Sequence, residues 1–529
     1  MRTLVCVPIM VHDDEVAIRD ARIAADGGAD LIELRIDEMF DGSDIELAAA
    51  RIESLIEASP LPVIVTCRAS DEGGMYEGDE DSRVALYERI AASSSVKSSP
   101  RFIDFELSHY TKSQNIKQKI NLAVDHSLQQ RDVKTSLILS CHDFKGVPQD
   151  LFRKLASMRD QPAAAVLKVA FLARNIRDAL EALHLPQASD RPMIALAMGE
   201  FGLLSRVLAP KFGGFLTFAA LRPAEVTAPG QPTLKELHDT YNFRSINRKT
   251  KVYGVIGWPV AHSKSPMLHN AGFQSIGFDG VYVPLPVAAF DDEDATFLSF
   301  KASLSEMLED VKLDFCGASV TLPHKVHLLR LAQERGWGRD EESVQAGAAN
   351  TIVRTGNDIR IMNSDVIAIR DCIKDISASR ALVLGAGGAA RAAIVALRKT
   401  VPSVYVAARD PSRAAALAQE FSIDVAAWDQ LANCQSDLII NCTPVGMAGG
   451  PAPDQSPLSQ AQLDSLDGRT CIFDTVYTPR ETPLIIAAAS RGMPTITGDR
   501  MFIAQARVQF EAWTGVKPPC EGPWSECPV

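Results

Sequence analysis

Eight short apolar runs recur through about the first 240 residues and constrain the fold more than any other feature of this chain. They begin at Thr3, Leu31, Pro62, Phe102, Ser136, Ala165, Met193 and Phe215. Segments whose apolar residues have helical spacing, such as 14–25 and 149–158, separate most of the runs. Continuous apolar runs are typical of parallel strands covered on both faces, and eight β–α repeats of this total length match a (β/α)8 barrel. The sequence therefore predicts an α/β fold that begins with a (β/α)8 TIM barrel over residues 1–242.

A glycine-rich turn at residues 385–388 indicates a different α/β fold in the second half of the chain. The turn follows the apolar run 381–384 and precedes a helical stretch that begins at Ala389. This order of strand, glycine turn and helix is typical of a dinucleotide-binding fold, and strand-like runs follow at 404–408, 437–442 and 471–477. We interpret the polar, basic residues 242–251 as a linker. We expect a Rossmann domain over 371–505 and a further domain over 251–370 that is completed by 506–529.

The bulk properties exclude several classes of protein. With 529 residues the chain is too long for one hydrophobic core. Its net charge of -12 and the lack of a long basic run argue against a nucleic-acid partner. No run has the length of a membrane span or the pattern of a signal peptide, and the 10 cysteines are scattered without a C-x-x-C pair. We expect a soluble, cytoplasmic protein with reduced thiols and without a metal, nucleic-acid or membrane partner.

Lys168 stands out because it lies inside the apolar run AAAVLKVAF. Burial disfavours the charged ammonium form of a lysine. Either the side chain reaches solvent at the strand end, or its amine is a nucleophile that forms a Schiff base with a ketone. Further polar residues end or follow neighbouring strands, and in a barrel such residues collect at one rim: Glu33, Arg35, Arg68, Glu72 and His142.

The segments IELRID, VTCRASDEGG, SCHDF, VLKVAF and TAPGQ, in this order, resemble type I 3-dehydroquinate dehydratase over residues 1–240. The resemblance implies that Lys168 forms an imine with the substrate ketone, and that His142 removes the proton beside the iminium carbon and later protonates the departing hydroxyl. A protonated imine is an electron sink, so an imidazole can remove that proton. Glu72 would orient His142. The implied substrate-binding residues are Glu33, Arg35, Arg68, Arg206, Thr227 and Gln231. Two residues depart from the family pattern: Cys141 replaces the usual Tyr, and Thr227 replaces the usual Ser.

The glycine turn GAGGAARA suits the pyrophosphate of a dinucleotide, whose charge the helix N-terminus stabilises. The alternative is a tight turn that binds nothing. After the next strand, Arg409 and Arg413 suit the 2′-phosphate of NADP, although Asp410 is the kind of acid that NAD enzymes place there. We expect NADP as the cofactor.

The segments GWPVAHSKSP, GASVTLPHK, GAANTIV, MNSD, NCTPVGM and GDRMFIAQA resemble shikimate dehydrogenase over residues 251–515. The resemblance implies that Lys325 supplies a proton to the substrate carbonyl while hydride arrives from nicotinamide, and that Asp365 orients Lys325. The implied substrate-binding residues are Ser263, Ser265, Thr321, Asn350, Tyr477 and Gln505. The implied cofactor-binding residues are Gly385, Ala386, Gly387, Gly388, Ala389, Arg409, Arg413, Thr443 and Gly498. The departures from the family pattern are Ser319 for Asn, Ser364 for Thr and Ala368 for Gly.

The two resemblances describe consecutive reactions. The product of the first, 3-dehydroshikimate, is the ketone that the second reduces to shikimate with NADPH. We therefore predict a bifunctional enzyme of the shikimate pathway whose partners are these small molecules, and its oligomeric state stays open. Two alternatives are a Schiff-base aldolase fused to a quinate dehydrogenase, and a metabolite-sensing regulator without catalytic activity. The arginines with His142 disfavour the first alternative, and the presence of Lys168, His142, Lys325 and Asp365 disfavours the second.

Overall fold

The computed structural model describes residues 2–91, 95–128, 134–225, 230–428, 431, 434–519 and 522–524. Two compact units divide the chain at Thr250: the first contains Met1–Thr250 and the short segment Val283–Pro286, and the second contains Lys251–Tyr282 and Val287–Val529. Within the described part of the chain, no helix combines the length and the apolar character that crossing a bilayer requires.

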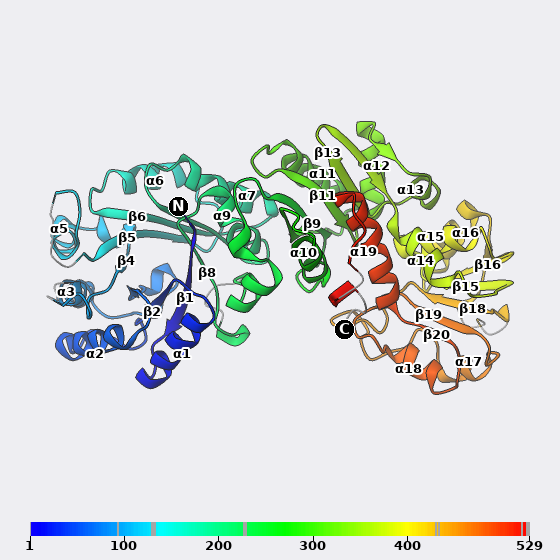
Figure 1. Ribbon diagram of the computed structural model, residues 1–529, viewed down its shortest axis with the longest axis horizontal. Coiled ribbons are helices and arrows are strands. Elements are labelled where there is room, and N and C mark those ends of the chain that lie inside the picture. Colours follow the sequence, from blue (N-terminus) through cyan, green and yellow to red (C-terminus); the bar gives the residue numbers. More distant parts are fainter. Residues whose placement is uncertain are drawn as a thin grey trace. The chain divides into compact units, whose positions relative to one another are not determined.

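The first unit is built on eight strands in the order β7-β6-β5-β4-β3-β2-β1-β8 (Figure 1). The strands are β1 Leu4–Met10, β2 Leu31–Arg35, β3 Val63–Thr66, β4 Phe102–Glu106, β5 Ser136–Asp143, β6 Ala164–Leu172, β7 Met193–Met198 and β8 Leu216–Phe218. Every neighbouring pair from β7 through β1 to β8 is parallel. A backbone hydrogen bond from Phe215 N to Met193 O closes the remaining gap. The predicted barrel is confirmed.

Helices alternate with these strands. They are α1 Asp14–Asp26, α2 Ile45–Ala58, α3 Glu80–Ala91, α4 Leu107–Tyr110, α5 Gln114–Ala123, α6 Leu151–Arg159, α7 Ile176–His184, α8 Leu203–Val207 and α9 Ala209–Phe212. Short turns of other helix types cover Ser70–Glu72, Leu185–Ala188, Pro223–Glu225, Glu236–Thr240 and Phe243–Ser245. Side-chain caps set several helix starts: the Asp13 carboxylate accepts the Val16 N–H at the start of α1, and Asn175 Oδ1 accepts the Arg177 and Asp178 N–H groups at the start of α7.

The barrel interior is layered along the strands. An apolar layer is formed by Cys6, Leu31, Ile64, Phe102, Ile138, Val166, Ile194 and Leu216. Side chains two positions apart in a strand share a face, so the next layer toward the carboxyl ends contains the residues two positions later. On five adjacent strands these are polar, namely Glu33, Thr66, Asp104, Ser140 and Lys168. The barrel interior therefore has a polar layer toward the carboxyl ends of the strands, next to an apolar layer toward their amino ends.

The segment 242–251, predicted to be a linker, packs against the barrel up to the unit boundary at Thr250. Phe243, Ile246 and Thr250 are buried. Arg244 donates to Asp30 Oδ2 at 2.8 Å and to Gly28 O at 2.6 Å, and Lys211 Nζ donates to Thr250 O at 2.7 Å. Polar residues of this segment thus bind it to the barrel.

After Thr250 the chain forms a mixed six-stranded sheet in the order β10-β9-β11-β13-β14-β12. Its strands are β9 Lys251–Gly257, β10 Gly280–Pro286, β11 Phe315–Val320, β12 Gly338–Arg339, β13 Thr351–Thr355 and β14 Asp358–Met362. Its helices are α10 Ser265–Ser275, α11 Glu293–Glu309, α12 Lys325–Arg335 and α13 Glu341–Ala346. Helix α19 Gly498–Thr514 packs on this sheet through Phe510 and Trp513, and Trp513 Nε1 donates to Ile352 O at 2.8 Å.

The last sheet is entirely parallel and has the order β17-β16-β15-β18-β19-β20 (Figure 1). Its strands are β15 Arg380–Leu384, β16 Ser403–Ala407, β17 Asp424–Val425, β18 Leu438–Asn441, β19 Cys471–Asp474 and β20 Thr495–Ile496. The helices are α14 Ser364–Ile373, α15 Gly388–Leu397, α16 Pro411–Phe421, α17 Gln460–Asp464 and α18 Pro483–Ala489, and a short turn covers Gly522–Trp524. Counted along the chain, the strand order is 3-2-1-4-5-6, which is the order of a dinucleotide-binding fold. The predicted Rossmann domain is confirmed.

Candidate active sites

Lys168 lies inside the barrel and does not reach solvent at the strand end. Only 6% of the residue is exposed. Its Nζ lies 2.7 Å from Asp104 Oδ2 and 3.8 Å from Glu33 Oε1, and 4.8 Å above the Phe218 ring. The strand register pairs Ser140 with Lys168 and His142 with Ala170. Since paired residues of parallel strands point to the same face, His142 and Lys168 share the barrel interior.

Arg68 joins Lys168 to a larger buried charge network. It donates to Asp104 at 2.7 Å, to Glu106 at 2.9 Å and to Ser140 Oγ at 2.9 Å. Arg83 donates to the other oxygen of Glu106 at 2.8 Å. The network contains equal numbers of buried cations and anions, namely Arg68, Arg83 and Lys168 against Glu33, Asp104 and Glu106. Such balance is required because an unpaired charge in this interior would be costly.

Asp104 is a site residue that sequence reasoning missed. It accepts hydrogen bonds from Lys168, Arg68 and Ser140, and the two cations hold the pKa of this carboxyl well below its usual range although burial alone would raise it. A signal was present in the sequence. Asp104 and Glu106 are two acids at alternate positions of the apolar run FIDFEL, so both face one side of a buried strand.

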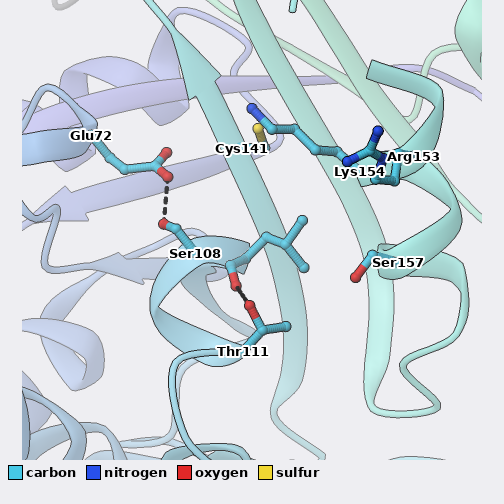
Figure 2. A pocket seen from close by; sticks show the side chains of 8 residues that line it. Glu72, Ser108, Thr111, Cys141, Arg153, Lys154 and Ser157 are labelled. Atoms are coloured by element: carbon cyan, nitrogen blue, oxygen red, sulfur yellow. Dashed lines mark hydrogen bonds between the residues drawn. The ribbon is translucent and has the colours of Figure 1, made fainter. Parts of the chain in front are cut away.

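Glu72 contacts His142 through two bonds. Its Oε2 lies 3.0 Å from His142 Nδ1 and accepts the His142 backbone N–H at 2.9 Å. Its Oε1 accepts the Ser108 hydroxyl at 2.6 Å (Figure 2). A carboxylate beside Nδ1 fixes the tautomer with the proton on Nδ1 and leaves Nε2 as the base. Burial and the charge of Arg68 lower the pKa of His142 below 6.5, so the imidazole is neutral at pH 7.

A cavity of about 240 Å³ lies beside Glu72, and the Cys141 thiol lines it (Figure 2). The lining residues are Glu72, Leu107, Ser108, Thr111, Cys141, Arg153, Lys154 and Ser157. Burial raises the pKa of Cys141 to about 11, so the thiol is protonated at neutral pH. Cys141, which replaces the family's usual Tyr, therefore contributes a neutral thiol to the lining of this cavity.

The remaining predicted residues of the barrel site are Arg35, Arg206, Gln231 and Thr227. Arg35 binds Asp37 through two hydrogen bonds of 2.8 and 2.9 Å. Arg206 is 2% exposed, burial lowers its pKa to about 10, and its Nε has no hydrogen-bond partner. Gln231 is buried. Thr227 lies outside the described residues.

In the second unit, Lys325 and Asp365 form an ion pair. Lys325 starts α12, Asp365 lies in the first turn of α14, and Nζ is 2.5 Å from Oδ2. A Cβ added at Gly388 would come within 3.0 Å of Lys325 Cδ. The predicted pair therefore lies directly against the glycine turn, and the lack of a side chain at Gly388 permits this approach.

Asn350 is held by a polar network next to this pair. Its Oδ1 accepts from Ser364 N at 2.8 Å, Ser364 Oγ at 3.0 Å and Thr351 Oγ1 at 2.9 Å. Since the acceptor side of the amide is occupied, Nδ2 is the atom available to donate to a ligand. Ser364, which replaces the family's Thr, also lies 3.5 Å from Gln505 Oε1.

Ser263 and Ser265 lie together at the start of α10, where Ser265 N donates to Ser263 Oγ at 3.3 Å. A Cβ added at Gly257, at the end of β9, would lie 2.4 Å from the Thr321 side chain. Tyr477 stacks on Phe502 at 4.6 Å between ring centroids. Tyr282 was not among the residues predicted for this site. Its hydroxyl donates to Ser319 Oγ at 2.7 Å.

Ser319 in turn donates to Gln509 Oε1 at 2.7 Å. Its replacement of the family's Asn therefore keeps a buried hydrogen-bonding role.

The glycine turn has the geometry of a pyrophosphate cradle. Gly385 has φ +112, and a Cβ added there would lie only 3.0 Å from the Cys442 carbonyl oxygen, so the lack of a side chain permits this close packing. Gly387 caps α15, and a Cβ added there would meet no atom within 4 Å. Ala386 and Ala389 are half-buried around this helix start. The open space, together with the helix N-terminus, fits a dinucleotide.

The residues after β16 favour NADP over NAD. Arg409, Asp410 and Arg413 are all exposed. The Asp410 carboxylate caps α16, because it accepts from Ser412 N at 2.9 Å and Ser412 Oγ at 2.6 Å. Asp410, the kind of acid that NAD enzymes use for the ribose, thus serves as the cap of α16. Arg409 and Arg413 stay available for a phosphate.

The remaining two predicted cofactor residues lie at loop and helix starts. Thr443 follows β18, and its N–H and hydroxyl both donate to Asn441 Oδ1. Gly498 starts α19, and a Cβ there would lie 2.2 Å from Val476 O. A group of three or more possible metal-ligating side chains does not occur among the described residues.

Three family models match the chain. Residues 5–248 match type I 3-dehydroquinase, residues 255–352 match the shikimate dehydrogenase substrate binding domain, and residues 368–448 match shikimate / quinate 5-dehydrogenase.

Similar proteins cover the whole chain or its second half. A chloroplastic bifunctional 3-dehydroquinate dehydratase/shikimate dehydrogenase of Arabidopsis thaliana is 35% identical over 99% of this chain and 84% of its own length. An NADP(+) shikimate dehydrogenase of Maridesulfovibrio salexigens is 35% identical over 50% of this chain and 92% of its own. The solved shikimate 5-dehydrogenase of Thermus thermophilus, in complex with NADP(H) and shikimate, is 30% identical over 51% of this chain and 95% of its own, with a TM-score of 0.44.

Proposed function

Since the chain belongs to the family of bifunctional 3-dehydroquinate dehydratase/shikimate dehydrogenases, we propose that Lys168 and Lys325 are the centres of its two activities. The protein is a shikimate-pathway enzyme that dehydrates 3-dehydroquinate and reduces the product, 3-dehydroshikimate, to shikimate with NADPH. What carries the assignment of residues is the meeting of Lys168, Glu33 and Asp104 in one buried site whose register also brings in His142.

In the barrel, Lys168 attacks the ketone carbon of the substrate, and loss of water gives a protonated imine. The carboxylates of Asp104 and Glu33 hold the Lys168 amine in place by ion pairing, and Lys168 attacks after it has lost a proton. Arg206 supports substrate binding in this site because its guanidinium is buried with an unpaired Nε, which suits the substrate carboxylate.

His142 Nε2 then removes the proton beside the iminium carbon and returns it to the departing hydroxyl, which leaves as water. Glu72 keeps Nδ1 protonated throughout, so one nitrogen performs both transfers. Hydrolysis of the imine releases the product and restores Lys168. The free imidazole is neutral at pH 7, as its first task requires.

In the second unit, Lys325 protonates the carbonyl oxygen of 3-dehydroshikimate, and Asp365 holds Lys325 in place. Asn350 donates through Nδ2 to a substrate oxygen, and Ser263, Ser265, Thr321, Tyr477 and Gln505 complete the binding site. NADPH, when bound, supplies the hydride. The glycine turn would hold its pyrophosphate, and Arg409 with Arg413 its 2′-phosphate.

We propose the domain boundaries 1–242, 251–370 with 506–529, and 371–505. The strands of each sheet fall within these limits, whereas α14 crosses residue 370 and α19 crosses residue 505. A cytoplasmic location and the absence of other partners remain predictions.

The test is to follow each step separately in the full-length protein. Purified protein with 3-dehydroquinate and NADPH should form shikimate. Lys168→Met should abolish dehydration but reduce added 3-dehydroshikimate at the wild-type rate, and Lys325→Met should do the reverse. Borohydride should label wild type in the presence of 3-dehydroquinate and should not label Lys168→Met. Labelling of that variant at another lysine would reject Lys168 as the nucleophile.

A further inference from the structure

We propose that Asp474 is a positioning residue of the reductase, whose carboxylate orients Asn441 and thereby fixes Thr443 against the glycine turn that receives the cofactor. The proposal rests on the assignment of that turn to NADPH under the proposed function. Asp474 would touch neither substrate nor cofactor.

Asp474 ends β19 and is completely buried. Its Oδ1 accepts from Asn441 Nδ2 at 2.9 Å and from Val476 N at 3.0 Å, and its Oδ2 accepts from the Thr482 hydroxyl at 2.6 Å. All three partners are donors. An ionised carboxylate can accept from all three, whereas a protonated one would have to turn its own hydrogen toward a donor.

The bond from Asn441 to Asp474 determines which way the Asn441 amide faces. With Nδ2 on the carboxylate, Oδ1 accepts the Thr443 N–H at 3.0 Å and the Thr443 hydroxyl at 2.7 Å. A flipped amide would set Oδ1 against the carboxylate and Nδ2 against the N–H, so both contacts would become repulsive. The acceptor oxygen Oδ1 of Asp474 therefore selects one amide orientation, and that orientation holds Thr443.

Thr443 lies at the cofactor turn. β18 and β15 are neighbours, with Asn441 paired to Leu384, and Cys442 N donates to Leu384 O at 2.8 Å. A Cβ added at Gly385 would come within 3.3 Å of Thr443 Cγ2. A shift of Thr443 would therefore change the space above the glycine turn, while the turn itself would stay attached to β15.

The other two bonds of Asp474 lead away from the cofactor. Thr482 caps α18 by accepting the Ile485 N–H at 3.3 Å, and Val476 packs against Gly498. The Thr482 contact offers an internal control. If Asp474 had a purely structural role, loss of its hydrogen bond to Thr482 should impair the reductase as much as loss of its bond to Asn441.

The experiment compares Asp474→Leu with the conservative Asp474→Asn and the control Thr482→Val in the full-length chain. The Kd of NADPH is measured by its fluorescence in the absence of any substrate, and KM and kcat of the reductase are measured separately. Dehydratase activity of the same chain reports the folding of the first unit. The reductase unit is checked by thermal unfolding.

We expect Asp474→Leu to raise the Kd and KM of NADPH about tenfold, because Thr443 is no longer held in place. A tenfold change corresponds to the loss of about one hydrogen bond between the protein and NADPH. The KM for the ketone substrate should change less than twofold. Asp474→Asn keeps an acceptor at Oδ1 and should stay within threefold of wild type, as should Thr482→Val. The effects of Asp474→Leu and Thr443→Val should not add, because both act on the same contact.

An unchanged Kd in a folded Asp474→Leu protein would overturn the proposal, as would additivity with Thr443→Val or an equal loss in Thr482→Val. If Asp474→Leu does not fold, Asn441→Ala breaks the same relay one step later and should give the same tenfold rise. Failure of the proposed function would look different, because the wild-type chain itself would then neither bind NADPH nor reduce 3-dehydroshikimate.

Discussion

Replacing Asp104 with asparagine removes one negative charge from the buried network of the barrel. The carboxylate lies 2.7 Å from Lys168 Nζ and 2.7 Å from Arg68. After the change, the remaining anionic partner of Lys168 is Glu33 at 3.8 Å, and that of Arg68 is Glu106 at 2.9 Å. The balance of three cations against three anions becomes an excess of one positive charge.

The magnitude follows from that excess. Removing one partner of a buried ion pair costs about 3–5 kcal/mol, because the other partner stays desolvated. For a unit of roughly 250 residues each kcal/mol shifts the midpoint of thermal unfolding by about 2–4 °C, so the barrel should unfold about 6–20 °C lower. The second unit should keep its own midpoint.

Calorimetry of the full-length chain is the assay. Added NADP stabilises the unit that binds it, so the transition that moves with NADP belongs to the second unit and the other to the barrel. The double variant Asp104→Asn with Lys168→Met removes a charge of each sign and should be at least about 1 kcal/mol more stable than the sum of the single effects. A barrel midpoint within about 2 °C of wild type in Asp104→Asn, or strict additivity, would refute the charge-balance argument.

Three other outcomes are expected. Glu72→Gln should lower dehydratase kcat by about 10²–10⁴-fold because His142 loses the partner that sets its tautomer, with the reductase rate of the same preparation as control; a change under threefold would speak against this role. Dehydratase kcat/KM should fall on acidification because His142 becomes protonated. Burial and the charge of Arg68 lower the pKa of His142, so the midpoint of the pH–rate profile should lie below 6.5. A midpoint above 7 would contradict the role of His142 as the base. Arg409→Ala should raise the KM of NADPH about tenfold, the loss of a charged phosphate contact, and leave the KM of NADH unchanged, while Asp410→Ala serves as the neighbouring control; equal losses for both cofactors would exclude a 2′-phosphate site.

Both folds could be predicted from the sequence because their signals are local. The eight apolar runs and the glycine turn between a strand and a helix depend on neighbouring residues only, and the structure contains all of them as expected. Lys168, His142, Lys325 and Asp365 could be proposed as site residues in the same way, since each belongs to a short motif.

The partners of these residues were decided by the tertiary structure. Asp104 is 64 residues from Lys168, and Glu72 is 70 residues from His142; strand register and loop path bring such pairs together, and neither is visible in a local pattern. The role of Asp410 as a helix cap and the packing of residues 242–251 on the barrel likewise depend on hydrogen bonds that form only after folding. Chemical identity and periodicity are properties of short segments, whereas charge balance and orientation arise when distant segments share a desolvated space.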